Sequence, residues 1–336
     1  MEQTTSGRSS GRVGVREVAA LAGVSTQTVS RVINDHPSIR AETRERVREA
    51  MDALGYRVNN AARALGTSRS RTLGVIASDA TLYGPSMGIA ALETAARREG
   101  RWVATAYADA ADEASVDAAL EHLLAQGVDG VILIAAHERT VAALAARTPG
   151  VPVAALHTGP GAEQQAAGAA LAVEHLAALG HRRIVRIAGP ADWLEEGARA
   201  AGFANALAVR GLRAGPGWSG DWSAASGSAV AAGVAAAVRG SAGPTAVVVA
   251  NDQMALGLMA GLASAGLDLP GEVSIVGFDD TPDAAFYRPA LTTIRLDLAG
   301  EARRCVAEVL GLSAPPPPAR PELVVRASTA PPLPAP

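Results

Sequence analysis

Nine short apolar runs, separated by amphipathic helical patterns, constrain the fold of this 336-residue chain more than any other feature. The runs are Leu73–Ser78, Trp102–Asp109, Gly130–Ala136, Val151–His157, Arg183–Gly189, Ala246–Asp252, Ser274–Asp280, Leu291–Asp297 and Glu322–Ser328. Strands that alternate with helices predict parallel sheets covered by helices on both faces. Nine strands are too many for one compact half, so the pattern predicts two doubly wound α/β lobes.

A different pattern, that of two short helices joined by a tight turn, occupies residues 15–34. Apolar residues at helical spacing predict the first helix: Val15, Val18, Ala19 and Ala22. Gly23 permits a tight bend, and the Ser25 hydroxyl can accept an unpaired amide proton as N-cap of the second helix. The pattern predicts a helix-turn-helix, and an ordinary helical hairpin is the alternative.

The outward face of the second predicted helix is polar, whereas Val29, Val32 and Ile33 face inward. The polar side chains are Thr26, Gln27, Ser30 and Arg31. In a major groove, Gln can pair with adenine and Arg with guanine. The segment Arg40–Leu54 predicts a third helix whose apolar face closes a three-helix headpiece.

Charge is divided unevenly along the chain. Residues 1–72 carry twelve Arg against seven acidic residues, a net of +5, and the remainder carries eighteen Arg against twenty-six, a net of −8. A basic N-terminal segment followed by an acidic remainder is typical of a protein whose N-terminal domain binds nucleic acid. The sequence contains no lysine, which excludes Schiff-base and pyridoxal-phosphate chemistry as well as a P-loop lysine.

The sequence favours a cytoplasmic binding protein over an exported protein or an enzyme. Its apolar runs are too short to cross a bilayer, and the polar first residues lack a signal segment. The single cysteine, Cys305, lies in a helical pattern and is interpreted as a packed small side chain. The histidines lack metal-ligand spacing, no G-x-S-x-G elbow follows a strand and no G-x-G-x-x-G marks a dinucleotide site, so no metal, cofactor or catalytic residue is expected.

Polar residues gather where the predicted strands end, at the edge where open α/β sheets bind ligands. They are Ser78, Asp79, Asp109, His157, Asn251, Asp252, Asp279, Asp280, Arg295 and Asp297. Arg199 and Trp222 follow other strands, and carboxylates, amides and an Arg beside one indole predict a sugar site. For any one of these residues, helix capping or loop bonding is the alternative role.

Several motifs together resemble the lactose repressor/galactose repressor (LacI/GalR) family. The segment 23–34 is similar to the family's headpiece, and the similarity continues to about residue 329. In the body it is carried by HLAALGH at 175–181, GDWSA at 220–224, VANDQMALG at 249–257, SIVGFDDT at 274–281 and LTTI at 291–294. The resemblance implies a helix-turn-helix headpiece plus hinge helix, then two lobes of periplasmic-binding-protein type.

The resemblance also implies domain boundaries. They are a disordered tail at 1–13, the headpiece at 14–57, the hinge helix and linker at 58–72, the core at 73–329 and a tail at 330–336. The first lobe is expected at about 73–169 and 298–320, and the second at about 170–295 and 321–329. Crossovers are expected to return late strands to the first lobe.

Site residues follow from the same resemblance. DNA contacts are expected from Thr26, Gln27, Ser30, Arg31, Asn34, Asn59 and Leu65, with Leu65 as a minor-groove wedge. Effector contacts are expected from Ser78, Leu82, Pro85, His157, Arg199, Trp222, Asn251, Asp279 and Leu296. His157, Leu296 and Leu298 stand where lactose-responsive members have Asp, Gln and Phe, so a galactoside is only a candidate effector.

The resulting hypothesis is a homodimeric repressor that binds palindromic operator DNA and releases it when a sugar binds between the lobes. The family's tetramerising C-terminal helix is replaced by Pro-rich residues, so a dimer is expected. Three alternatives stay open: a corepressor-dependent or activating regulator of the same architecture, a sugar-binding transport protein, and an enzyme of sugar or nucleoside chemistry.

Overall fold

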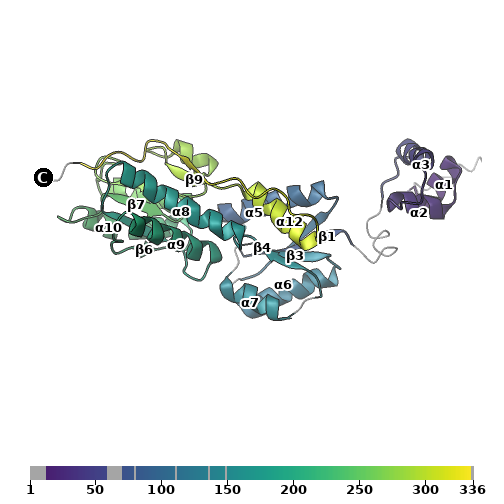
Figure 1. Ribbon diagram of the computed structural model, residues 1–336, viewed down its shortest axis with the longest axis horizontal. Coiled ribbons are helices and arrows are strands. Elements are labelled where there is room, and N and C mark those ends of the chain that lie inside the picture. Colours follow the sequence, from purple (N-terminus) through teal and green to yellow (C-terminus); the bar gives the residue numbers. More distant parts are fainter. Residues whose placement is uncertain are drawn as a thin grey trace, which may run out of the picture. The chain divides into compact units, whose positions relative to one another are not determined.

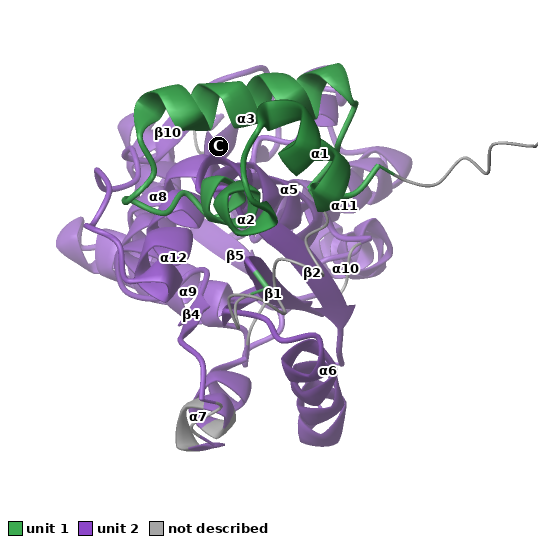
Figure 2. Cartoon of the chain, turned by 90° about the vertical axis from the view of Figure 1, so that its right-hand side faces the viewer, with its two compact units in different colours: residues 1–70 green, residues 71–336 purple. Residues whose placement is uncertain are grey.

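The computed structural model describes residues 13–58, 70–78, 81–109, 112–134, 137–147 and 150–333. Figure 1 shows its helices and strands. The chain divides into two compact units, residues 1–70 and residues 71–336, which Figure 2 shows in different colours.

The first unit is the predicted three-helix headpiece. It contains α1 (Val15–Ala22), α2 (Thr26–Ile33) and α3 (Ala41–Ala53). Its core consists of Val18, Ala19, Ala22, Val29, Val32, Val47 and Ala50. Gly23 ends α1 with a left-handed φ of 64°, and the Ser25 hydroxyl accepts the Thr28 amide proton at 3.1 Å, as the turn and cap predictions required. Arg44 pairs with Asp35 at 2.9 Å and thereby ties α3 to the loop after α2.

The second unit contains two α/β lobes, and the first of these has the sheet order β2-β1-β3-β4, all parallel. The strands are β1 (Thr72–Ala77), β2 (Trp102–Tyr107), β3 (Gly130–Ile134) and β4 (Val153–Ala155). One face is covered by α5 (Tyr83–Arg98) and α12 (Leu298–Leu310), and the other by α6 (Glu113–Ala125) and α7 (Glu138–Arg147) (Figure 1). The central strands β1 and β3 are thus buried on both faces, as parallel sheets require, whereas the edge strand β2 is only partly buried.

The second lobe repeats this architecture with the parallel order β6-β5-β7-β8. Its strands are β5 (Ile184–Ala188), β6 (Trp218–Ser219), β7 (Ala246–Val249) and β8 (Ser274–Val276). One face packs against α8 (Pro160–Ala178) and α9 (Leu194–Val209), and the other against α10 (Ala224–Val238) and α11 (Asp252–Ser264). The sequence pattern missed β6, because a two-residue edge strand has no periodicity to detect.

The late part of the chain differs from the expected crossover of strands. A helix, α12, returns to the first lobe and packs beside α5 (Figure 1). The late strands β9 (Thr293–Arg295) and β10 (Glu322–Val324) instead form their own antiparallel ribbon against α8. The expectation that late strands return to the first lobe is therefore wrong. The short helix η1 (Pro282–Phe286) precedes this ribbon.

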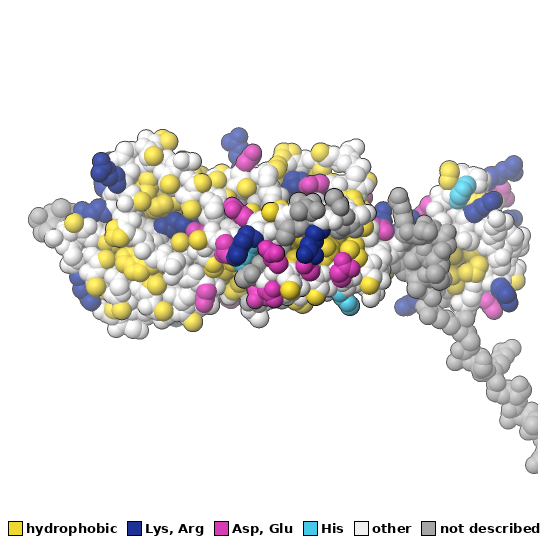
Figure 3. Space-filling view, turned by 90° about the horizontal axis from the view of Figure 1, so that it is seen from below, with side chains coloured by type: hydrophobic (Ala, Val, Ile, Leu, Met, Phe, Trp, Pro, Cys, Tyr) yellow, Lys and Arg dark blue, Asp and Glu magenta, His cyan; other side chains and the backbone are white. Residues whose placement is uncertain are grey.

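The surface of the core mixes acidic and basic side chains. Figure 3 shows them interspersed on the face seen from below in Figure 1, which includes α6 and α7. Arg147 of α7 pairs with Asp117 of α6 at 2.5 Å. Among the residues described, no helix is long and apolar enough to cross a membrane.

Candidate functional site

The two lobes of the core bring polar residues together at the carboxyl ends of their strands. Ser78 follows β1 and His157 follows β4 in the first lobe, whereas Asn251 and Asp279 follow β7 and β8 in the second. Open α/β sheets bind ligands at this edge. His157, Trp222 and Asp279 have left-handed φ angles of 63°, 74° and 111°. Such backbone is costly for residues other than glycine and concentrates at functional sites.

A cavity of about 570 Å³ contains part of the predicted effector set. Ser78, Leu82 and Trp222 line it, together with Tyr107, Ala108, Asp109, Ser115, His137, Pro190, Trp193 and Asp221. The Ser78 hydroxyl and the Trp222 indole Nε1 are buried without a hydrogen-bond partner in the described structure. Two unpartnered polar atoms on an aromatic wall suit a small polar ligand, since unpaired buried groups are costly.

Arg199 on α9 lies beside Trp222, with its guanidinium carbon 5.6 Å from the centre of the indole ring, and it is held by four groups. Its Nε donates to Gln165 Oε1 at 2.7 Å, another nitrogen donates to the Ala250 carbonyl, and a third reaches Asp279 Oδ1 at 3.3 Å. Its guanidinium carbon also lies 3.9 Å from the centre of the Phe278 ring. Only 6% of Arg199 is exposed, so its position is fixed before a ligand arrives.

His157 connects this network to the first lobe. Its Nδ1 lies 2.9 Å from Gln165 Nε2 and 3.2 Å from a carboxylate oxygen of Glu301, and its backbone amide donates to the same carboxylate. Burial alone would lower the pKa of His157, but the Glu301 carboxylate outweighs it and raises that pKa. Burial likewise favours the neutral form of Glu301, yet His157 lowers its pKa. The pair therefore favours imidazolium and carboxylate together.

The carboxyl ends of β7 and β8 hold two further acids. Burial raises the pKa of Asp279 to about 6, although Arg199 opposes the shift. Burial and the neighbouring Asp279 raise the pKa of Asp252 to about 7. Asn251 caps α11, because its Oδ1 accepts the Met254 amide proton at 2.8 Å, and it donates to the Trp222 carbonyl at 3.0 Å. Asn251 therefore has the capping role given as the alternative, and it also fixes the backbone of Trp222.

The remaining predicted effector residues lie around these groups. Pro85 is buried in the first turn of α5. Leu296 lines a different cavity, of about 450 Å³, with Tyr83, Asp279 and Arg295. Leu296 is thus separated from the residues around Trp222, because the chain leaves β9 there and runs toward α12. Asp280, expected in a strand beside Asp279, lies in the loop after β8 and pairs with Arg295 and Arg326.

Sequence reasoning missed Gln165, Glu195 and Glu301. All three are buried, and Gln165 and Glu301 join Arg199 and His157 across the core. Gln165 lies on the side of α8 that carries small residues, between Gly161 and Gly168. A polar amide among small residues was the sequence signal that could have indicated a buried polar contact. Glu195 and Glu301 occupy first turns of helices, where acidic residues are common on the surface, so the sequence held no sign of their burial.

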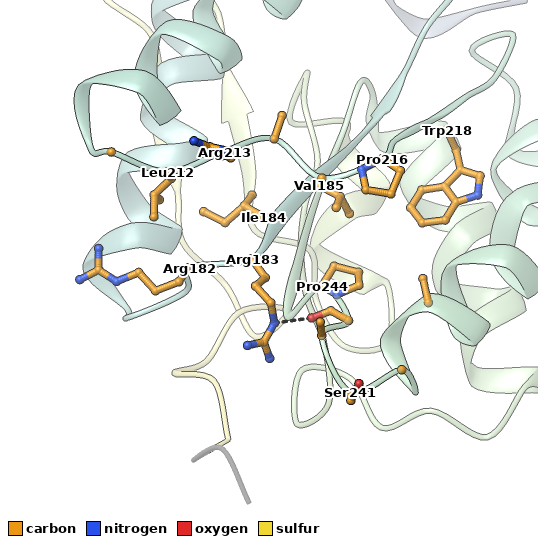
Figure 4. A pocket seen from close by; sticks show the side chains of 17 residues that line it. Arg182, Arg183, Ile184, Val185, Leu212, Arg213, Pro216, Trp218, Ser241 and Pro244 are labelled. Carbon is orange, nitrogen blue, oxygen red and sulfur yellow. Dashed lines mark hydrogen bonds between the residues drawn. The ribbon is translucent and has the colours of Figure 1, made fainter.

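Another cavity, of about 650 Å³, lies at the opposite end of the second lobe (Figure 4). Arg183, Ile184, Leu212, Trp218 and Pro244 are among its lining residues, and Arg183 Nε donates to the Gly243 carbonyl at 2.5 Å. It adjoins the amino ends of β5 and β7 and contains none of the predicted effector residues. Because open α/β sheets bind ligands at the carboxyl ends of their strands, the candidate site is the one at the carboxyl ends instead.

The expected DNA-reading residues lie on α2 of the headpiece. Thr26, Gln27, Ser30 and Arg31 are exposed, on the face opposite the buried Val29 and Val32. Asn34 is half-buried at the C-cap of the helix. Four exposed polar side chains on one helix present the donors and acceptors that base edges require. Asn59 and Leu65 fall outside the described residues.

Comparison with known proteins gives two family matches. Residues 15–59 match the family described as "Bacterial regulatory proteins, lacI family", and residues 173–329 match a periplasmic binding protein-like domain. The lactose operon repressor of Escherichia coli (strain K12) is 36% identical over 313 residues, covering 90% of this chain and 85% of the relative. The regulator GalR of the same organism is 31% identical, with 89% of each sequence covered.

Solved structures agree with these matches. The lac repressor dimer bound to operator and the anti-inducer ONPF superposes with a TM-score of 0.78 at 34% identity, covering 95% of this chain and 99% of that one. The complex of the transcriptional regulator CelR with cellobiose has a TM-score of 0.67 at 27% identity, covering 95% of this chain and 100% of that one.

Proposed function

Because the chain belongs to the lacI family of bacterial regulatory proteins, we propose that it is a cytoplasmic repressor that a sugar releases from operator DNA. The observation that carries the sugar part is the set of fixed and unpartnered polar groups between the lobes. Arg199 and Asp279 hold each other at 3.3 Å, while the Ser78 hydroxyl and Trp222 indole lack partners among the described groups. The function is binding, with no chemical step.

The headpiece supports the DNA part of the proposal. It presents Gln27 and Arg31 on one exposed helix face, and the segment that contains it carries the net positive charge of the chain. A homodimer would place two such helices in successive major grooves of a palindromic site, about one helical turn apart. The relatives' dimeric and operator-bound state supports this arrangement.

The core offers a direct route for coupling. Strand β1 begins at Thr72, directly after the segment that joins the headpiece, and leads to Ser78 in the cavity. The lobes touch beside the same cavity, where the Tyr83 amide donates to Gln253 Oε1 at 3.1 Å. A sugar that binds better to one lobe arrangement shifts the equilibrium toward it, and operator affinity changes by the same coupling free energy.

The test starts from the full-length protein and a pool of random duplex DNA. Selection is expected to enrich a palindrome, and binding to it is then measured with and without lactose, galactose, cellobiose, galactosamine and glucosamine. We expect one of these sugars to weaken operator binding at least about tenfold, which corresponds to about 1.4 kcal/mol of coupling. Failure to enrich any sequence would contradict the repressor function. Tighter binding with sugar would indicate a corepressor-dependent regulator instead.

A further inference from the structure

One oxygen of a buried carboxylate on α9 is left without a hydrogen-bond partner. Glu195 occupies the first turn of α9, only 7% of it is exposed, and its Oε2 has no hydrogen-bond partner in the described structure. No described cation lies within ion-pairing distance of it. Burying an ionised carboxylate without a partner costs several kcal/mol, so a fold that keeps one there needs a compensating interaction.

Glu195 lies on the same face of α9 as Arg199. It precedes Arg199 by four residues on α9, and residues at this spacing lie on the same face of a helix. Its charge also raises the pKa values of both His157 and Asp279. The Glu195 carboxylate therefore lies within electrostatic range of the two groups that flank Arg199.

The neighbouring Glu196, in the same turn of α9, is a buried carboxylate that has its partners within the protein. Its oxygens pair with Arg186 at 2.6 Å and accept the Gly189 amide proton at 2.9 Å. Glu196 is only 3% exposed and is satisfied within the protein. Two adjacent buried acids thus differ in one respect, namely that the chain provides a cation for Glu196 and none for Glu195 among the residues described.

The other buried acids around the site already have partners. Arg199 pairs with Asp279 at 3.3 Å, and His157 pairs with Glu301 at 3.2 Å. Asp252 has no cation, but its oxygens accept hydrogen bonds from the Thr281 amide at 2.8 Å and the Thr293 hydroxyl at 2.6 Å. Glu195 differs from these acids because one of its carboxylate oxygens has neither a cation nor a hydrogen-bond donor among the described residues. A neutral sugar can donate hydroxyl protons to it but leaves its charge uncompensated.

We infer that the effector carries a positively charged amino group, as an amino sugar does, and that this group binds the carboxylate of Glu195. This inference rests on the proposed function and specifies its ligand class. Ammonium–carboxylate hydrogen bonds are about twice as strong as neutral ones, and they gain further where water is excluded. Glu195 is then the residue that selects the amino sugar over its neutral counterpart.

The experiment compares sugars that differ only in the substituent at C2, which is an ammonium, an acetamido or a hydroxyl group. Dissociation constants are measured by calorimetry on the full-length protein for D-galactosamine, N-acetyl-D-galactosamine and D-galactose, and for the corresponding gluco sugars. We expect one amino sugar to bind at least about tenfold more tightly than both its acetylated and its hydroxyl counterparts. Glu195→Gln is expected to remove this preference. Glu163→Gln, the same substitution at an exposed position of α8, is expected to keep it.

The outcomes separate the inference from the proposed function. Equal binding of amino and neutral sugars to the unmodified protein overturns the inference while leaving sugar-controlled repression intact. A preference for the amino sugar that persists in Glu195→Gln shows that this carboxylate does not select the ligand. Operator binding that no effector changes contradicts the proposed function itself. If Glu195→Gln does not fold, the charged-against-acetylated comparison on the unmodified protein still decides the ligand class.

Discussion

Gln165 Oε1 accepts a hydrogen bond of 2.7 Å from Nε of Arg199, and this bond joins α8 to α9 in the middle of the core. The amide nitrogen of the same side chain lies 2.9 Å from His157, which in turn contacts Glu301 on α12. A continuous polar chain therefore runs from the first lobe to Asp279 in the second. Because every member is buried or nearly so, displacing one member leaves another unsatisfied.

Arg199→Ala is expected to abolish the response to effector while the headpiece still binds operator. The substitution removes the donor that a sugar hydroxyl would meet and leaves Asp279 buried without its cation. The core should lose about 3–5 kcal/mol of stability, the usual result of breaking a buried pair. Operator affinity with and without sugar, measured on protein shown to be folded, checks this. Induction that persists in the variant would mean that the effector binds elsewhere.

Arg210→Ala, at the C-cap of α9, is the matched control. Arg210 pairs with Glu174 at 3.4 Å at the surface, where both side chains are partly exposed. Surface pairs contribute at most about 1 kcal/mol, so induction and stability should change little.

Arg31→Ala is expected to weaken operator binding by about 1–3 kcal/mol and to relax base preference at one position. Arg31 is exposed on α2, where its guanidinium group can donate to two acceptors of a guanine. Arg48→Ala removes the same charge from an exposed position of α3 and serves as control. Affinities for operators mutated at single positions give the test. Unchanged preference would show that Arg31 contacts phosphate only.

The pair of His157 and Glu301 predicts a pH-dependent contribution to stability. The raised pKa of His157 stabilises the fold below the ordinary value of 6.5, and this contribution is lost as pH rises through the raised pKa. The lowered pKa of Glu301 stabilises the fold above 4.5 and is lost as pH falls through the lowered pKa. The pair thus contributes most between these two values. His157→Gln should therefore cost more unfolding free energy at pH 5.5 than at pH 8.5.

His175→Gln is the control for this titration. Burial lowers the pKa of His175, so this residue favours the neutral form and should show the opposite pH trend. Chemical denaturation of both variants at the two pH values provides the measurement. A cost of His157→Gln that is equal at both values would contradict an ionised pair.

The sequence predicts those parts of the fold that depend on local pattern. The Ser25 cap, the Gly23 turn and the inward Val29 were all readable because capping and helical periodicity involve residues a few positions apart. The ends of the parallel strands were readable for the same reason. The positions of Ser78 and Asp279 near the carboxyl edges follow from them, whereas their contact with an effector remains a prediction.

The features that the sequence does not predict depend on distant partners. Glu301 meets His157 144 residues away, and a carboxylate in the first turn of a helix has no local mark of such a contact. Local sequence likewise does not determine that α12 returns to the first lobe, or that β9 and β10 form a separate ribbon. Each outcome depends on which of several similar segments come into contact. Periodicity identifies these strands but does not choose their sheet.

The contact of α8 with α9 gives a prediction about stability, carried by two glycines of α9. A Cβ at Gly202 would collide with the backbone carbonyl of Ala166 on α8, whereas a Cβ at Gly197 would meet nothing within 4 Å. Ala exceeds Gly in helix propensity by about 1 kcal/mol, so Gly197→Ala should stabilise the core by roughly that amount. Gly202→Ala should instead destabilise it by about 1–3 kcal/mol, because backbone atoms must move to admit the methyl group. Urea unfolding of the two variants measures the difference. Since Gln165 and Arg199 lie on these two helices, Gly202→Ala should also weaken effector binding, and equal stability of the two variants would contradict the close approach.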